Sequence, residues 1–313
     1  MWSATLRPTE STDLIRLRVG GPRDMENLFG WGVGGFLTGL REGVEAALIV
    51  GIIAGYLVKI GRSDRLGVIW AGVLAAIATS AAIGVGAFLI LGGLEGDTEK
   101  LIEGFTSLLA VVILTYMIFW MRKQAVTLGA ELRKGVDRAI ASASIFGLAA
   151  LAFTAVIREG IETALFLLGQ TTAASEAGAG SWVAVGALIG LAVATLIGVA
   201  IFRAGVRLNL GAFFNVTGAA LVVIAAGLLS YGAHELIEVG LLPAIVAPVY
   251  DLSGVLPHTE GIGQFLRAIV GYSATPELSA LLLQIGYLAF GLFFYVLPVR
   301  RASAVRAVSG ATS

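Results

Sequence analysis

The chain has 313 residues, of which 57% are hydrophobic and only 13% are charged, and its mean hydropathy is +0.90. Soluble globular proteins carry roughly 25% charged residues, so these values indicate an integral membrane protein. The 21 basic residues are matched by 21 acidic ones, which argues against a nucleic-acid partner. The absence of cysteine excludes disulfides, thiolate metal sites and iron–sulfur clusters.

Seven apolar stretches are long enough to cross a bilayer, because a helical span needs about 20 mostly apolar residues. The ten-residue alternating segments of a membrane barrel are absent from the sequence. We therefore expect an all-α fold, a polytopic membrane helical bundle with seven transmembrane helices. The expected spans are residues 28–58, 67–92, 103–121, 139–169, 182–202, 213–237 and 279–299.

Basic residues at the ends of the spans predict the orientation, because Lys and Arg are retained on the cytoplasmic side. They gather after the first, third, fifth and seventh spans. We expect a multi-pass protein of the plasma (inner) membrane, with the bilayer as its constant partner, the N-terminus outside and the C-terminus in the cytoplasm. The predicted divisions are an N-terminal tail over 1–25, a seven-helix domain over 26–299 and a cytoplasmic tail over 300–313.

The N-terminal tail conflicts with this orientation, because four arginines would lie outside. It lacks the apolar region of a signal peptide. Our hypothesis is that translation begins at Met25 and that residues 1–24 are not translated.

Two of the spans carry the same charged pattern, Arg-Glu-Gly-x-Glu, several residues from either end. Charges at this depth are costly and are usually functional. Residues three and four apart share one face of a helix, so the two glutamates of each copy point the same way and the arginine reaches the second of them. The first copy has Arg41, Glu42, Gly43 and Glu45, and the second has Arg158, Glu159, Gly160 and Glu162.

Four glutamates and two arginines leave a formal charge of −2, which would not stay ionised in hydrocarbon without compensation. A bound cation would supply it. Carboxylate oxygens favour hard cations over copper(I) or zinc. Buried ion pairs that merely cross-link the spans are the alternative, and the presence of two copies favours the ion site.

Three crossings separate the two motifs, so the spans that carry them run in opposite directions. The chain divides into two three-helix halves and one further helix, a 3+3 inverted repeat plus one. Inverted repeats with a site at their interface are typical of transporters that work by alternating access.

Rows of small residues at four-residue spacing predict close packing between helices. One row runs through Gly35, Gly39, Gly43, Ala47, Gly51 and Gly55, and another through Gly186, Gly190, Ala194 and Gly198. In the two charged motifs the glycine has a second interpretation, since it could admit an ion or permit local unwinding, but packing is favoured there too.

An acidic mouth is expected on the outer side, where it would concentrate cations. An ordinary solvated loop and a polar helix end explain the same residues equally well. The candidates are Glu95, Asp97, Glu99, Glu103, His234, Glu235 and Glu238. We assign no role to His258, which lies in a loop with Pro and Gly.

The sequence resembles the oxidase-dependent ferric iron permease family, including the bacterial EfeU-type permeases. The resemblance covers nearly the whole chain from Met25 onward and rests on REGVE at 41–45, REGIE at 158–162, LTYMIFWM at 114–121 and AAGLLSYGAHEL at 225–236. It implies import of Fe3+ through Glu42, Glu45, Glu159 and Glu162. It also implies an extracytoplasmic oxidase or peroxidase that delivers the iron.

Two alternatives remain at this stage. Related permeases are assigned other metals such as lead, so a divalent or lead-type importer would use the same glutamates. An intramembrane metal-dependent hydrolase is disfavoured, because such sites depend on histidine and neither motif contains one. A phosphate-binding loop of the GxxxxGK[ST] type is missing, so we do not expect ATP to drive transport directly. We expect no organic cofactor, and the iron is cargo.

Overall fold

The computed structural model describes residues 22–91, 96–124, 128–142, 144–175, 178–204 and 210–310, and this part of the chain is all-α. A short 3₁₀ turn, Ser63–Arg65, precedes the second helix. The helices are α1 (Pro22–Lys59), α2 (Leu66–Leu91), α3 (Asp97–Gln124), α4 (Leu128–Ala141), α5 (Ile145–Ser175), α6 (Gly180–Ala204), α7 (Leu210–Glu238), α8 (Gly261–Val270) and α9 (Leu278–Gly310).

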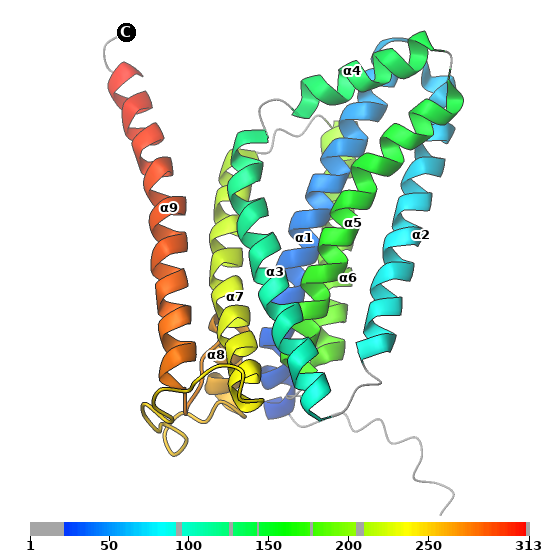
Figure 1. The fold of residues 1–313 in the computed structure, drawn as a ribbon. Coiled ribbons are helices and arrows are strands. Elements are labelled where there is room, and N and C mark those ends of the chain that lie inside the picture. Colours follow the sequence, from blue (N-terminus) through cyan, green and yellow to red (C-terminus); the bar gives the residue numbers. More distant parts are fainter. Residues whose placement is uncertain are drawn as a thin grey trace, which may run out of the picture.

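Each predicted span overlaps one long helix, and the long helices alternate in direction along the bundle (Figure 1). The bounds of the fourth span, 139–169, are wrong, because its first residues belong to α4 and the long helix α5 runs over 145–175. Among the described residues, α2, α3, α6 and α7 are long and apolar enough to cross a membrane by length and composition. α1 and α5 each carry three charged residues in their middle, which interrupts an otherwise apolar helix. The protein is embedded in the membrane through these apolar helices, and the count of seven crossings stays a prediction.

The expectation of seven helices missed α4 and α8, so the described residues contain nine α-helices. Both are short. α4 is amphipathic and lies across the end of the bundle where the C-terminus is found, packed against α1 and α5 (Figure 1). α8 lies at the opposite end, beside α1 and α7.

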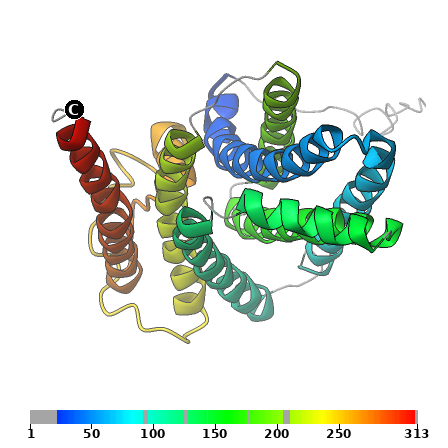
Figure 2. The ribbon, with the colours of Figure 1, turned by 90° about the horizontal axis from the view of Figure 1, so that it is seen from above.

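α1 and α5 lie side by side in the centre of one half of the molecule, flanked by α6 and α2 (Figure 2). α1 packs along α6 and α2 packs along α5, in each case in parallel, whereas α1 and α5 are antiparallel. α3 packs on α7, and α9 contacts the bundle mainly through α7 at its edge. The two helices with charged motifs are therefore the most enclosed.

The glycine rows explain the contact between α1 and α6. A Cβ on Gly35 would lie 2.0 Å from the carbonyl oxygen of Val183, and one on Gly39 would lie 2.3 Å from that of Ala187. The prediction of close packing is confirmed for this part of the row. It is wrong for Gly51, where a Cβ would have no atom within 4 Å.

Two apolar clusters lie on either side of the charged motifs. One joins α3, α5 and α7 around Leu114, Phe166 and Leu221. The other joins the second half of α1 with α2, α4 and α5 around Ile53 and Val136. The motif residues lie between these clusters along α1 and α5, which places them near the middle of the bundle.

The predicted tails have different outcomes. Residues 1–21, which make up most of the N-terminal tail, lie outside the described residues. α1 begins at Pro22 and thus includes Met25. α9 continues to Gly310, so most of the predicted C-terminal tail over 300–313 is helical.

Candidate metal centre

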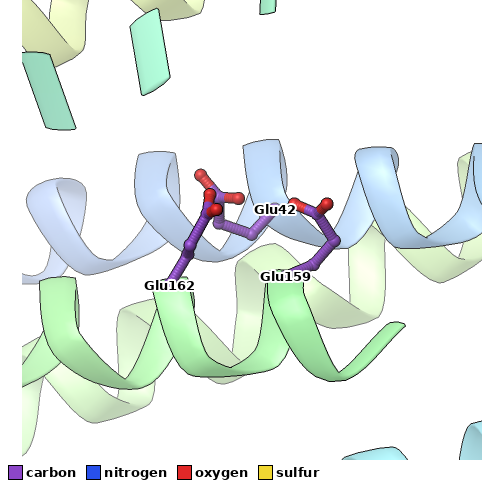
Figure 3. A group of neighbouring side chains, drawn as sticks. All are labelled: Glu42, Glu159 and Glu162. Atoms are coloured by element: carbon purple, nitrogen blue, oxygen red, sulfur yellow. The ribbon is translucent and has the colours of Figure 1, made fainter. Parts of the chain in front are cut away.

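The two motifs meet where α1 and α5 cross. Carboxylate oxygens of Glu42, Glu159 and Glu162 all lie within 4.8 Å of one another (Figure 3). Glu42 comes from α1, and the other two come from successive turns of α5. Three carboxylates from two antiparallel helices thus converge on one small volume, and the sequence predicted all three.

These carboxylates are shielded from solvent. Glu42 is 1% exposed and Glu159 is 5% exposed, while the Glu162 side chain is 14% exposed. One oxygen of each (Oε2) is buried without a hydrogen-bond donor in the described part of the chain. Buried polar atoms are normally satisfied, because leaving one unpaired is costly. A cation bound between the three carboxylates would satisfy these oxygens.

Glu45, the fourth predicted ligand, lies beside this group but does not belong to it. It is 3% exposed, and its Oε1 lies 3.3 Å from Nε of Arg41. In the structure, Glu45 is therefore an ion-pair partner of Arg41. A place in the ligand set remains a prediction.

The two arginines have different surroundings, although their motifs are alike. Arg41 is 2% exposed, lies 3.5 Å from Glu42 Oε1, and donates to Met117 Sδ at 3.7 Å. Arg158 is 36% exposed, donates from Nε to Glu162 Oε1 at 2.9 Å, and stacks over the Trp120 ring at 3.8 Å. Both neighbours lie on α3, so α3 positions both arginines, a role that the repeated pattern did not reveal.

The motif glycines are packing positions. α1 and α5 continue through them without a break. A Cβ on Gly43 would lie 2.6 Å from Ala194 Cβ, and one on Gly160 would lie 2.0 Å from Ser80 Oγ. The interpretation as close packing is confirmed, and the alternative of local unwinding is wrong in this conformation.

A groove of about 910 Å³ between α2 and α6 reaches Glu42 and Glu159 from the side of the bundle. Most of its lining is apolar, including Val50, Leu188 and Phe202. Such a surface offers nothing to replace the water shell of an ion, because desolvating a charge without polar partners is very costly. The groove is therefore suited to hydrocarbon and not to a hydrated cation.

The predicted mouth residues are not gathered into one acidic surface. Glu103 accepts a hydrogen bond of 2.6 Å from Tyr231, and Glu238 pairs with Lys100 and lies 3.5 Å from His234 Nε2. Glu235 is 1% exposed, so it faces the protein interior. Asp97 and Glu99 lie at the start of α3, the former exposed and the latter partly buried. Glu95 lies outside the described residues.

Sequence reasoning missed a polar cavity of about 320 Å³ at this end of the bundle. Of the predicted mouth residues that the structure describes, only His234 lines it. Its other polar lining includes Glu277, Gln170 and His258, the histidine to which we assigned no role. One feature of the sequence could have pointed to this cavity. Glu277 lies just before α9, so it is an acidic residue that adjoins a predicted span on the predicted outer side.

The chain is similar in sequence to known proteins. The model of the iron permease FTR1 family matches residues 32–300. The ferrous iron permease EfeU of Escherichia coli strain 536 is 39% identical over 278 residues, which are 87% of this chain and 99% of that protein. The ferrous iron permease EfeU of Yersinia pestis is 38% identical over 267 residues, 85% of this chain and 93% of that protein. An uncharacterized protein of Archaeoglobus fulgidus is 40% identical over 265 residues, 82% and 92% of the two chains. No solved structure is significantly similar to the chain.

Proposed function

Because the chain belongs to the iron permease FTR1 family, we propose that it imports iron in the ferric state and that Glu42, Glu159 and Glu162 hold the ion halfway across the membrane. Like its named relatives, which are permeases, the protein is a permease and not an enzyme. The hydrolase alternative is therefore set aside.

The convergence of three carboxylates within 4.8 Å carries this proposal. All of these donors are anionic oxygens, and the nearest positive charges are the two motif arginines. Oxygen donors favour hard cations, and Fe3+ is harder than Fe2+. The arginines orient Glu42 and Glu162 and limit the net charge, so that the site can release its ion as well as bind it.

Ferrous iron is the second candidate, because the relatives from Escherichia coli and Yersinia pestis are named ferrous iron permeases. The same carboxylates would accept Fe2+ and other divalent ions such as lead, since hard oxygen ligands discriminate weakly between them. Oxidation state and metal selectivity therefore require a direct transport measurement.

Helix packing supports alternating access as the mode of transport. In an inverted repeat, α1, α2 and α3 would correspond to α5, α6 and α7. Under this correspondence the packed pair α1–α6 becomes α5–α2, which is also a packed pair, and the pair α3–α7 becomes itself. This is the packing that an inverted repeat would produce, with the carboxylates at the interface of its halves. We propose that one half rocks against the other around this site.

The remaining features of the proposal concern the surroundings of the permease. The end of the bundle that carries α4 and the C-terminus faces the cytoplasm, as the basic residues of the sequence predict. The end that carries α8 faces outward, toward an extracytoplasmic oxidase or peroxidase that would supply ferric iron.

Glu45 assists at the central site through Arg41.

Uptake of radioactive iron tests the proposal. Cells without their own iron importers would express the wild type or Glu159→Gln, with and without a membrane-impermeant chelator specific for ferrous iron. We expect uptake that survives the chelator and is lost in the variant. Uptake lost to the chelator would identify Fe2+ as the cargo, and variant uptake at the wild-type rate would refute the site. An excess of unlabelled lead or manganese in the same assay measures selectivity.

The Arg158–Trp120 contact predicts a smaller effect on the same uptake. Trp120→Leu removes the ring face that holds the guanidinium, and a cation–π contact contributes about 0.5–2 kcal/mol. We expect uptake to fall by about twofold to thirtyfold, with Trp120→Phe closer to wild type. Phe105→Leu is the control, because Phe105 is an exposed aromatic residue of α3 that lies several turns away from Trp120. Equal uptake in Trp120→Leu and wild type would contradict a positioning role for the ring.

A further inference from the structure

The cavity of about 320 Å³ at the outer end of the bundle contains buried polar atoms that lack a partner. It lies between α1, α5, α7 and α8 and is closed by the segment before α9. Gln170 is 3% exposed and Trp31 is 6% exposed, and both line it. Gln170 Oε1 and Trp31 Nε1 have no hydrogen-bond partner in the described part of the chain. An unsatisfied acceptor and an unsatisfied donor in one cavity indicate a ligand that carries water or is itself polar.

The Gln170 oxygen points into this space. It lies 3.2 Å from the position that a Cβ on Gly34 would occupy, and Gly34 also lines the cavity. The missing side chain at Gly34 leaves room for a group to reach the oxygen. The amide nitrogen of Gln170 donates to Thr38 Oγ1 at 2.7 Å, which fixes the side chain in this orientation.

A histidine and a carboxylate, two kinds of side chain that can bind a metal, line the same cavity. His234 Nδ1 and Glu277 Oε1 lie 2.7 Å apart. Adjacent ligands around a first-row transition metal lie about 3 Å apart, since metal–ligand bonds are about 2.1 Å long. One metal ion can therefore contact both atoms in place of the proton that the pair shares, once the two side chains turn toward it. Imidazole is a ligand that suits iron as well as zinc, copper and nickel.

The charges around the cavity favour weak and reversible binding. Arg267 lines it as well and offsets Glu277, so the cavity has no net formal charge when His234 is neutral. A transit site must bind an ion strongly enough to admit it and weakly enough to release it.

A hydrogen-bonded pair lies between this cavity and the central site in the sequence of α1. Gln170 and Thr38 are joined by their hydrogen bond, and both are buried. Thr38 precedes Glu42 by four residues, so it lies one turn away on the same face of α1. Along α1, the Gln170–Thr38 pair therefore lies between the outer cavity and Glu42.

We propose that this cavity is a second metal site, at which His234 and Glu277 bind an incoming, partly hydrated transition-metal cation before it passes Gln170 and Thr38 to Glu42. The inference rests on the proposed function and adds an outer binding step to it. His234 and Glu277 supply the metal ligands, and Gln170 and Trp31 bind the water that the ion retains.

Equilibrium dialysis against radioactive Fe3+, kept in solution as its citrate complex, tests the second site in the full-length protein in lipid nanodiscs. We expect His234→Gln and Glu277→Gln each to bind one ion fewer per chain than wild type. His258→Gln is the matched control, because it alters the other histidine of the chain in the same cavity. Its Nδ1 accepts the Ala274 N–H at 3.0 Å, and we expect it to bind as many ions as wild type.

Uptake kinetics separate the outer site from the central one. We expect His234→Gln to raise the half-saturating iron concentration by about tenfold while the maximal rate stays within about twofold of wild type, because saturating iron can bypass a receiving site. Equal numbers of bound ions in wild type and His234→Gln would overturn the outer site. If uptake then still disappeared in Glu159→Gln, the proposed function would stand without it. Absence of iron uptake by the wild type would overturn both.

Discussion

Replacing Glu42 with glutamine is expected to reduce iron uptake by more than about a hundredfold. Glutamine keeps the size of the side chain but removes the charge of a ligand that is 1% exposed and faces Glu159 and Glu162. Loss of a residue that merely supports a metal ligand lowers metal affinity or activity by about 10–100-fold. Loss of the ligand itself should lower uptake by more. The measurement is the initial rate of radioactive iron uptake, normalised to the amount of protein in the membrane.

Two further variants make this result specific. Glu131→Gln removes a carboxylate from the exposed face of α4 and should leave uptake unchanged. Glu45→Gln should have an intermediate effect, because Glu45 contacts Arg41 and lies outside the group of three carboxylates. Equal loss in Glu45→Gln and Glu42→Gln would place all four glutamates in the ligand set. Normal uptake in Glu42→Gln would contradict the central site.

Much of the central site could be predicted because its chemistry is local in sequence. Helical periodicity alone places Glu159 and Glu162 on one face, and the cost of burying charge in an apolar helix predicts that they are functional. The glycine spacing of α1 likewise predicted close packing against another helix, since only small residues allow backbones to approach so closely. These inferences need no knowledge of which helix lies next to which.

The remaining features depend on contacts between distant segments. The Gln170–Thr38 hydrogen bond joins residues 132 positions apart, and the His234–Glu277 pair joins α7 to the segment before α9. Periodicity carries no information on such pairs. The same limit explains why the two motifs looked equivalent: only the packing of α3 gives Arg41 a methionine and Arg158 a tryptophan.

The contact between α1 and α6 predicts the largest effect on stability. A Cβ on Gly35 would lie 2.0 Å from the Val183 carbonyl oxygen, which is backbone and cannot turn aside as a side chain can. Overpacking typically costs about 1–3 kcal/mol, and a clash with backbone lies at the upper end. We expect Gly35→Ala to lower the melting temperature of the purified protein by on the order of 5 °C or more, measured by tryptophan fluorescence.

Gly51→Ala supplies the control on the same helix and in the same sequence row. Its Cβ would meet no atom within 4 Å, and alanine favours a helix over glycine by about 1 kcal/mol. The melting temperature should therefore stay the same or rise. If both variants were destabilised alike, glycine itself would be required along the whole row, and the close approach of α1 to α6 would not explain the pattern. We expect the added methyl group to have opposite effects at these two positions of one row. That result would show that the spacing specifies a close helix contact only as far as Ala47, because α1 and α6 pack less closely beyond it.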